Sequence, residues 1–127
     1  MKTFTIVAGA LAAAVAAASP AMAGGSAANG KKLFDSYCDE CHTTEEGGAS
    51  RKAPNMFGLI GRQAGTLPGF EYTDANRAAG WVWTEAVLDR YLTAPKQAIP
   101  GTNMKFKGIP DADERQDVIA YLATLRK

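Results

Sequence analysis

Apolar side chains return at intervals of three and four residues in three stretches of the chain, a spacing that places them on one face of an α-helix. In the first stretch they are Leu33, Phe34 and Tyr37. Ser26 precedes this stretch, and a serine hydroxyl can accept a free backbone N–H at a helix start. The pattern therefore predicts a first helix that begins after Ser26 and runs towards Cys38.

A second helix is predicted after Thr84, whose hydroxyl can cap it in the same way. Proline lacks a backbone N–H and clashes with the preceding helical turn, so Pro95 sets the limit of this helix. The apolar residues that share one face within it are Val87, Leu88, Tyr91 and Leu92.

A last helix is predicted close to the C-terminus. Asp111 and Glu114 stand three residues apart, which resembles the capping box found at helix starts. The residues that would face inward along this helix are Val118, Ile119, Tyr121, Leu122 and Leu125.

The segment from Glu45 to Gly80 has a different composition, rich in Gly, Pro, Asn and Thr, which is typical of loops. Within it, only the residues from Asp74 to Ala79 suggest a short helix. No internal repeat, low-complexity stretch or linker divides the chain after residue 23. We therefore expect one domain over residues 24–127, of a size that supports a single core.

Residues 1–23 have the order of a secretory signal peptide. Lys2 precedes an apolar run over residues 4–18, and small residues lead up to Ala23. We expect cleavage after Ala23. The alternative is an uncleaved segment that tethers the same domain to a membrane, although the run is shorter than the roughly 20 apolar residues of a spanning helix.

The balance of charge excludes one class of partner. The chain has 14 Lys and Arg residues and 13 Asp and Glu residues, and removal of residues 1–23 takes away only Lys2. The remaining chain is formally neutral. Nucleic-acid binding depends on counterion release at a clustered basic surface, so we expect no nucleic-acid partner.

The only two cysteines and the only histidine of the chain stand together as Cys38-Asp39-Glu40-Cys41-His42. This is the C-x-x-C-H pattern of covalent haem attachment. In that chemistry two thiols reach the two vinyl groups on one edge of the porphyrin, while the adjacent imidazole turns under the iron. We therefore expect one haem c, bound covalently through Cys38 and Cys41, with His42 as an iron ligand.

Two other interpretations of the cysteine pair are weaker. A redox-active disulfide of the thioredoxin type needs a βαβ context, and no Val- and Ile-rich runs flank the pair. A structural zinc ion usually takes four protein ligands, whereas only Cys38, Cys41 and His42 are at hand. Both alternatives therefore lack part of what they require.

The second protein ligand of the iron is sought among the methionines, because the chain has no second histidine. Two of the four methionines lie in residues 1–23. Met56 follows His42 by only 14 residues, which is too short to reach the opposite haem face, and it is interpreted as core. Met104 lies 62 residues beyond His42, in a loop over residues 99–106 that can close over the far face. We expect Met104 to be the ligand.

Five further runs follow the C-x-x-C-H motif in a fixed order and spacing: Pro54-Asn55-Met56-Phe57-Gly58, Gly61-Arg62, Pro68-Gly69-Phe70, Tyr72-Thr73-Asp74-Ala75-Asn76 and Ile99-Pro100-Gly101-Thr102. With these runs the chain, from about Gly30 to its end, resembles a class I cytochrome c of the mitochondrial or bacterial type. The resemblance implies the all-α class I cytochrome c fold, in which the N- and C-terminal helices cross and loops wrap one covalent haem. It also implies that Gly30 lets these helices approach closely and that Phe34 packs near Tyr121.

The resemblance further implies roles on the His42 side of the haem. The carbonyl of Pro54 would accept a hydrogen bond from the ring N–H of His42 and so fix the tautomer of the imidazole. Tyr72 and Trp83 would hydrogen-bond the buried haem propionate. Arg62 would lie close enough to offset the negative charge of that propionate.

On the other side of the haem, the resemblance implies a polar network of Asn76, Tyr91 and Thr102 beside Met104. Phe106 would shield the haem edge from water. With protein ligands on both faces, the iron has no vacant position for oxygen, peroxide or an organic substrate.

We therefore expect a monomeric, soluble one-electron carrier with no catalytic residue and no organic substrate. The alternatives are a haem peroxidase or gas-binding sensor in which Met104 detaches, and a subunit docked to a larger oxidoreductase. Since haem c is attached outside the cytoplasm and residues 1–23 suit export, we expect a periplasmic electron-transport protein. A respiratory chain, photosynthesis and methanol-type oxidation are the pathways that it could serve. Its expected partners are membrane or periplasmic redox proteins such as a quinol-oxidising complex, a dehydrogenase or a terminal oxidase.

The charges expected around the haem edge depart from the family pattern. Mitochondrial members ring this edge with lysines that steer them to acidic partners. Here Tyr37, Gln97 and Asn103 stand where lysine is common, and Ala98 replaces an aromatic residue, a change expected to loosen the loop. We expect association to depend less on salt than in strongly basic relatives. The basic residues left to form a local patch are Lys31, Lys32, Arg51, Lys96, Lys105 and Lys107.

Overall fold

The computed structural model describes residues 24–127, so the expected signal peptide at residues 1–23 lies outside the described residues. An isolated β-bridge between Gln63 and Val82 is the one element of β-structure in residues 24–127. This part of the chain is therefore all-α, as expected, and none of its helices is long and apolar enough to span a membrane. Its helices are α1 (Ala27–Tyr37), α2 (Asp74–Arg77), α3 (Glu85–Thr93), α4 (Pro95–Ala98) and α5 (Ala112–Thr124).

The three longer helices begin at the residues that the sequence indicates. The side chains of Ser26, Thr84 and Asp111 each accept a hydrogen bond from the backbone N–H three residues further on, at 3.2, 3.1 and 2.9 Å. These bonds satisfy N–H groups of the first turn that have no partner inside the helix. The predicted starts are confirmed, and α2 lies within the short helix expected over residues 74–79.

Pro95 ends one helix and begins another. Helix α3 stops at Thr93, as expected, but the chain then forms the short helix α4, which the apolar pattern does not predict. Proline suits the first position of a helix because its φ is already helical and its missing N–H is not needed there. After α4 the chain enters the loop that carries Met104.

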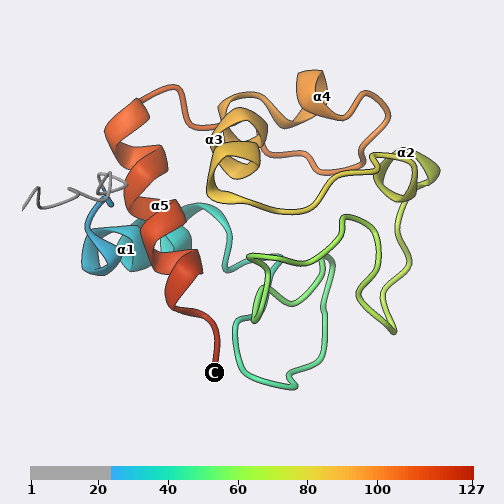
Figure 1. Ribbon diagram of the computed structural model, residues 1–127, viewed down its shortest axis with the longest axis horizontal. Helices are drawn as coiled ribbons and strands as arrows, with labels where there is room; N and C mark the ends of the chain where they lie inside the picture. Colours follow the sequence, from blue (N-terminus) through green and yellow to red (C-terminus); the bar gives the residue numbers. More distant parts are fainter. Residues whose placement is uncertain (1–23) are drawn as a thin grey trace, which may run out of the picture.

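Helices α1 and α5, far apart in the sequence, pack against each other and cross (Figure 1). The ring of Phe34 in α1 meets the ring of Tyr121 in α5 edge to face, with centroids 5.4 Å apart. A Cβ atom at Gly30 would overlap the backbone carbonyl of Asp117, so only glycine permits this approach. The carboxylate of Asp117 also accepts a hydrogen bond from the backbone N–H of Ser26 at 2.6 Å. The expected crossing is confirmed.

The core lies between the crossed helices and α3 and extends beneath the loops that follow the C-x-x-C-H motif. Met56 is 8 % exposed and belongs to this core, which confirms its interpretation as a packing residue. Arg115 joins α5 to α3 through an ion pair with Asp89 at 2.9 Å. The inward-facing residues of α5 are Val118, Ile119 and Leu122, which are buried, and Tyr121 and Leu125, which are partly buried.

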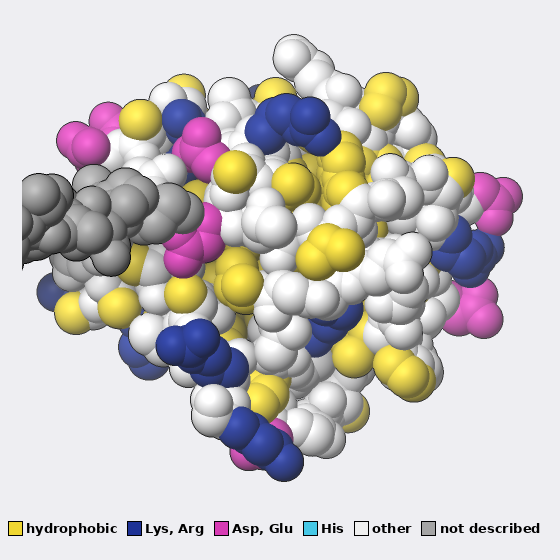
Figure 2. Space-filling view, viewed as in Figure 1, with side chains coloured by type: hydrophobic (Ala, Val, Ile, Leu, Met, Phe, Trp, Pro, Cys, Tyr) yellow, Lys and Arg dark blue, Asp and Glu magenta, His cyan; other side chains and the backbone are white. Residues whose placement is uncertain are grey.

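The surface carries both signs of charge. Figure 2 shows acidic and basic side chains interspersed over the face in view, with apolar side chains between them. No field of a single sign covers this face. The acidic and basic residues that balance in the sequence are thus also mixed with one another on this face of the surface.

Candidate functional site

The C-x-x-C-H motif follows directly from α1, so the crossed helices hold its start in place. The N–H of Cys38 donates to the carbonyl of Phe34 at 2.7 Å, and the N–H of His42 donates to the carbonyl of Cys38 at 2.9 Å. Both cysteines are free thiols and both are partly buried. Two thiols and one imidazole therefore emerge from a single turn of the chain.

The thiol of Cys38 is held in its neutral form. Burial raises its pKa to about 12, with smaller contributions from Cys41 and Asp39, so it is protonated at neutral pH. That pKa does not bear on metal binding, since a metal ion deprotonates the thiols it binds, but a structural zinc site also needs four protein ligands. Among residues 24–127, no group of three or more His, Cys, Asp and Glu side chains is arranged to hold a metal ion. The donor set does not match structural zinc.

The imidazole of His42 is oriented by the carbonyl of Pro54, which lies 2.7 Å from Nδ1. Because a carbonyl only accepts hydrogen bonds, Nδ1 carries the proton and Nε2 keeps its lone pair. Burial lowers the pKa of His42, and the Pro54 carbonyl offsets part of this effect. A neutral imidazole with a free Nε2 lone pair is the form that ligates a metal.

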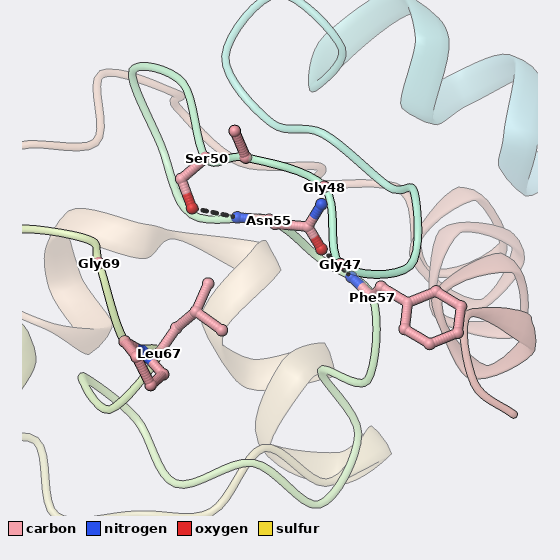
Figure 3. Close-up of a pocket in the computed structure, with 9 residues that line it drawn as sticks. Gly47, Gly48, Ser50, Asn55, Phe57, Leu67 and Gly69 are labelled. Atoms are coloured by element: carbon pink, nitrogen blue, oxygen red, sulfur yellow. Dashed lines mark hydrogen bonds between the residues drawn. The ribbon is translucent and has the colours of Figure 1, made fainter.

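Asn55 organises the loop that carries Pro54. It is 5 % exposed, and its Nδ2 donates to Thr43 Oγ1 at 2.9 Å and to the Glu45 carbonyl at 3.0 Å. Its Oδ1 accepts a hydrogen bond from the N–H of Phe57 at 2.8 Å (Figure 3). The residue pattern assigns no such role to Asn55. The only signal in the sequence is an amide side chain directly after the proline.

A cavity of about 420 Å³ lies between the loops of residues 47–50 and 67–69 (Figure 3). Asn55 forms part of its wall, and its backbone N–H donates to Ser50 Oγ at 3.0 Å. None of the residues predicted to bind haem lines this cavity. It is therefore separate from the candidate haem site.

Arg62 and Trp83, which the family resemblance places near a haem propionate, are neighbours, because the N–H of Trp83 donates to the carbonyl of Arg62 at 2.8 Å. The Arg62 guanidinium donates to the carbonyls of Asn55 at 3.0 Å and Phe57 at 2.6 Å. Burial lowers the pKa of Arg62, and the nearby Tyr72 hydroxyl partly offsets this.

Arg62 is a partly buried cation, and no carboxylate in residues 24–127 forms an ion pair with it. A cation withdrawn from water is stabilised by a nearby negative charge. The surroundings of Arg62 therefore suit an anionic group such as a propionate.

Met104 is held from two sides. The hydroxyl of Tyr91 donates to Met104 Sδ at 3.1 Å, and the N–H of Met104 donates to Thr102 Oγ1 at 3.3 Å. Burial raises the pKa of Tyr91, while a hydrogen bond with Thr102 lowers it. Asn76, predicted in the same network, instead accepts a hydrogen bond from the Thr73 hydroxyl at 2.7 Å. Tyr91 and Thr102 thus contact Met104, whereas Asn76 is engaged within α2.

Aromatic rings border both parts of the site. Trp83 is buried between Trp81 and Tyr91, with ring centroids 5.7 and 5.0 Å away. Phe106 packs against Tyr37, with centroids 5.8 Å apart. Tyr37 precedes Cys38 and Phe106 follows Met104 by two residues, so this second pair joins the motif to the Met104 loop.

Similarity to known proteins extends over almost all of the described residues. Residues 27–126 match the cytochrome c family. Cytochrome c of Sesamum indicum is 45 % identical over 98 residues, which are 77 % of this chain and 88 % of that protein. Cytochrome c of Gibberella zeae is 46 % identical over 101 residues, 80 % of this chain and 95 % of that protein. Cytochrome c of Chlamydomonas reinhardtii is 45 % identical over 98 residues, with 77 % and 88 % covered.

Proposed function

This chain belongs to the cytochrome c family of haem c electron carriers, and from this premise we propose that it holds the haem iron between His42 and Met104. The observation that carries the proposal is the hydrogen bond between His42 Nδ1 and the Pro54 carbonyl, because it leaves Nε2 as the free donor. Of the two methionines in residues 24–127, Met56 is buried in the core and Met104 lies partly exposed in a loop. Met104 is therefore the thioether available to the iron.

The residues present fit the group. Two free thiols and a neutral imidazole stand in one turn, a thioether is held by Tyr91, and the cation of Arg62 lacks an acidic partner among the described residues. Haem c, when bound, supplies an iron that accepts and releases one electron. The chain contributes attachment through Cys38 and Cys41, orientation of the imidazole through Pro54, and an apolar enclosure that limits the access of water.

The carrier interpretation is favoured over a peroxidase or a gas sensor. An enzyme that cleaves an O–O bond needs a positioned acid or base beside an open iron. The only histidine is His42, and the Arg62 guanidinium is engaged with backbone carbonyls. The two hydrogen bonds that hold Met104 also oppose its release.

Optical spectra of the purified holoprotein test the ligand assignment. We expect the near-infrared sulfur-to-iron band in the oxidised form and no binding of carbon monoxide in the reduced form. Met104→Ala should lose the band and bind carbon monoxide, whereas Met56→Leu should behave as the unmodified protein. If Met104→Ala kept the band, the proposed ligand would be wrong. Rapid carbon monoxide binding by the unmodified protein would favour the sensor or peroxidase.

We also propose that the protein is exported, cleaved after Ala23 and active in the periplasm. The relatives described above are eukaryotic, so the support comes from this chain's own first residues, with Lys2, an apolar run and small residues before Gly24. Cell fractionation and intact mass spectrometry test this. We expect a periplasmic chain that begins at Gly24 and carries the mass of one haem. Recovery of residues 1–23 in a membrane fraction would support the tether instead.

Cytochromes c act with redox partners, and we propose that those of this chain include a quinol-oxidising complex or dehydrogenase as donor and a terminal oxidase as acceptor. Membranes from the source cells should reduce the added holoprotein when supplied with quinol and reoxidise it with oxygen. Light scattering should show a monomer. A stable complex with a larger oxidoreductase would favour the subunit alternative.

A further inference from the structure

Tyr37 and Phe106 form an aromatic pair at the surface, with ring centroids 5.8 Å apart and planes inclined by 36°. Tyr37 is 45 % exposed and is the only exposed aromatic side chain among residues 24–127. The pair joins the segment that leads into Cys38 to the segment that leaves Met104. A molecule seated on it therefore lies beside both haem-binding segments.

The exposed ring of Tyr37 is suited to contact with another protein. Aromatic residues are enriched, and charged residues depleted, at the centres of protein–protein interfaces. The Tyr37 ring already rests on Phe106, so it loses little conformational freedom when a partner covers it. Burial of its exposed part would then contribute apolar contact at low entropic cost.

The charges on the Cys38 side of the pair are compensated. Residues 31–52 contain four basic and five acidic side chains. Three of the four basic side chains face an acidic neighbour, so this side has no positive field to attract an acidic partner. The pairs are Lys31 with Asp35 at 2.8 Å, Arg51 with Asp39 at 3.9 Å and Lys52 with Glu40 at 3.5 Å.

The Met104 side of the pair is weakly basic. Residues 95–107 contain Lys96, Lys105 and Lys107 and no acidic residue. None of these lysines forms an ion pair within the described part of the chain. The aromatic pair thus lies between a segment whose basic side chains are mostly paired with acidic ones and a segment that carries three lysines unpaired within residues 24–127.

We propose that the Tyr37–Phe106 pair meets redox partners whose docking surface is apolar and nearly uncharged, in place of the acidic surfaces that lysine-ringed relatives meet. This rests on the proposed function as an electron carrier. A strongly acidic partner would bring carboxylates against Asp35, Asp39 and Glu40, and this like-charge contact is unfavourable. The surface can accommodate a few carboxylates opposite Lys105 and Lys107.

Electron self-exchange between oxidised and reduced holoprotein tests the proposal, because a second copy presents the same apolar pair. The rate is measured by NMR magnetisation transfer over a range of salt concentrations. For the unmodified protein we expect a change of less than about twofold between low and high salt, since little charge is screened. Tyr37→Lys should slow self-exchange about tenfold at low salt, with partial recovery at high salt, because two like charges then meet.

Two variants serve as controls. Val82, next to Trp83, is also 45 % exposed and lies outside the two segments that carry the aromatic pair, so Val82→Lys adds the same charge away from the proposed surface. It should exchange electrons as the unmodified protein does. Tyr37→Phe keeps the ring and should also keep the rate.

Two results would overturn the proposal: self-exchange of the unmodified protein that rises more than about tenfold with salt, or a Tyr37→Lys rate equal to that of Val82→Lys throughout. If Tyr37→Lys fails to take up haem, the salt dependence of self-exchange in the unmodified protein still tests the proposal. A protein that lacks haem in its optical spectrum, or cannot be cycled between oxidation states, would contradict the electron-carrier function rather than the docking surface.

Discussion

The hydroxyl of Tyr91, in α3, donates a hydrogen bond to the sulfur of Met104, in the loop after α4, across 3.1 Å. A donor on a thioether draws electron density from the sulfur. A sulfur polarised in this way donates less electron density to a bound iron. The oxidised iron depends on that density more than the reduced iron does, so the hydrogen bond favours the reduced state. The bond therefore both positions the proposed ligand and sets its electronic character.

The first prediction concerns this bond. Tyr91→Phe should lower the reduction potential by tens of millivolts, since a net hydrogen bond of about 1 kcal/mol corresponds to about 40 mV for one electron. Spectroelectrochemical titration measures the change. Tyr37→Phe removes a hydroxyl from an exposed ring and should leave the potential unchanged. An unchanged or raised potential in Tyr91→Phe would contradict the argument.

The second prediction concerns the helix crossing. Gly30→Ala should lower the free energy of unfolding by about 2–3 kcal/mol, because the new Cβ overlaps the Asp117 carbonyl and forces the helices apart. Gly58→Ala is the comparison. There φ is +73° and a Cβ meets nothing within 4 Å, so only the roughly 1–2 kcal/mol of left-handed backbone is lost. Denaturant titration would refute the steric account if Gly30→Ala proved the milder change.

The third prediction concerns the loop beneath His42. Asn55→Ala should cost about 2–4 kcal/mol, because the Phe57 N–H loses its acceptor and the Thr43 hydroxyl and the Glu45 carbonyl each lose a donor. Hydrogen exchange at the Phe57 amide should accelerate with it. Asn103→Ala, at an exposed position of the Met104 loop, should change stability little. Equal losses of stability in Asn55→Ala and Asn103→Ala would contradict the role of Asn55 in organising this loop.

The fourth prediction concerns pH. Burial lowers the pKa of His42 below its ordinary value of 6.5, so the unfolded chain binds a proton that the folded chain does not. The free energy of unfolding should therefore fall as pH drops below about 6.5, by at most about 1.4 kcal/mol per pH unit.

Denaturant midpoints at pH 7.5 and pH 5 measure this effect in the holoprotein, where the proposed bond to iron also keeps the folded imidazole unprotonated. His42 is the only histidine, and carboxyl groups ordinarily titrate near pH 4, so this interval reports mainly on one side chain. A midpoint that stays constant or rises towards pH 5 would contradict the prediction.

The starts of the longer helices could be predicted from the sequence because capping is local. Ser26, Thr84 and Asp111 each act three residues away. Helix α4 could not be predicted, because Pro95 is equally suited to end one helix and to begin another. The crossing of α1 and α5 required the family resemblance, since periodicity identifies the inward face of a helix but not the element it meets.

The candidate site likewise contains residues that could be predicted from the sequence and contacts that could not. Cys38, Cys41 and His42 could be identified because their chemistry requires them to be adjacent. The contact of His42 with Pro54 spans 12 residues and that of Tyr91 with Met104 spans 13, so spacing alone cannot establish them. The bonds of Asn55 and the pairing of Asn76 with Thr73 depend on loop and side-chain conformation that composition does not encode.

The crossing of the first and last helices also bears on the order of assembly. Residues 38–42 are synthesised long before residues 112–124, and until then α1 lacks the partner that stabilises it. An isolated helix of 11 residues is marginal in water, so the attachment segment stays accessible until α5 packs against α1. Covalent attachment of haem to the two thiols is therefore favoured before α5 packs against α1. The packing of α5 then completes the folded protein.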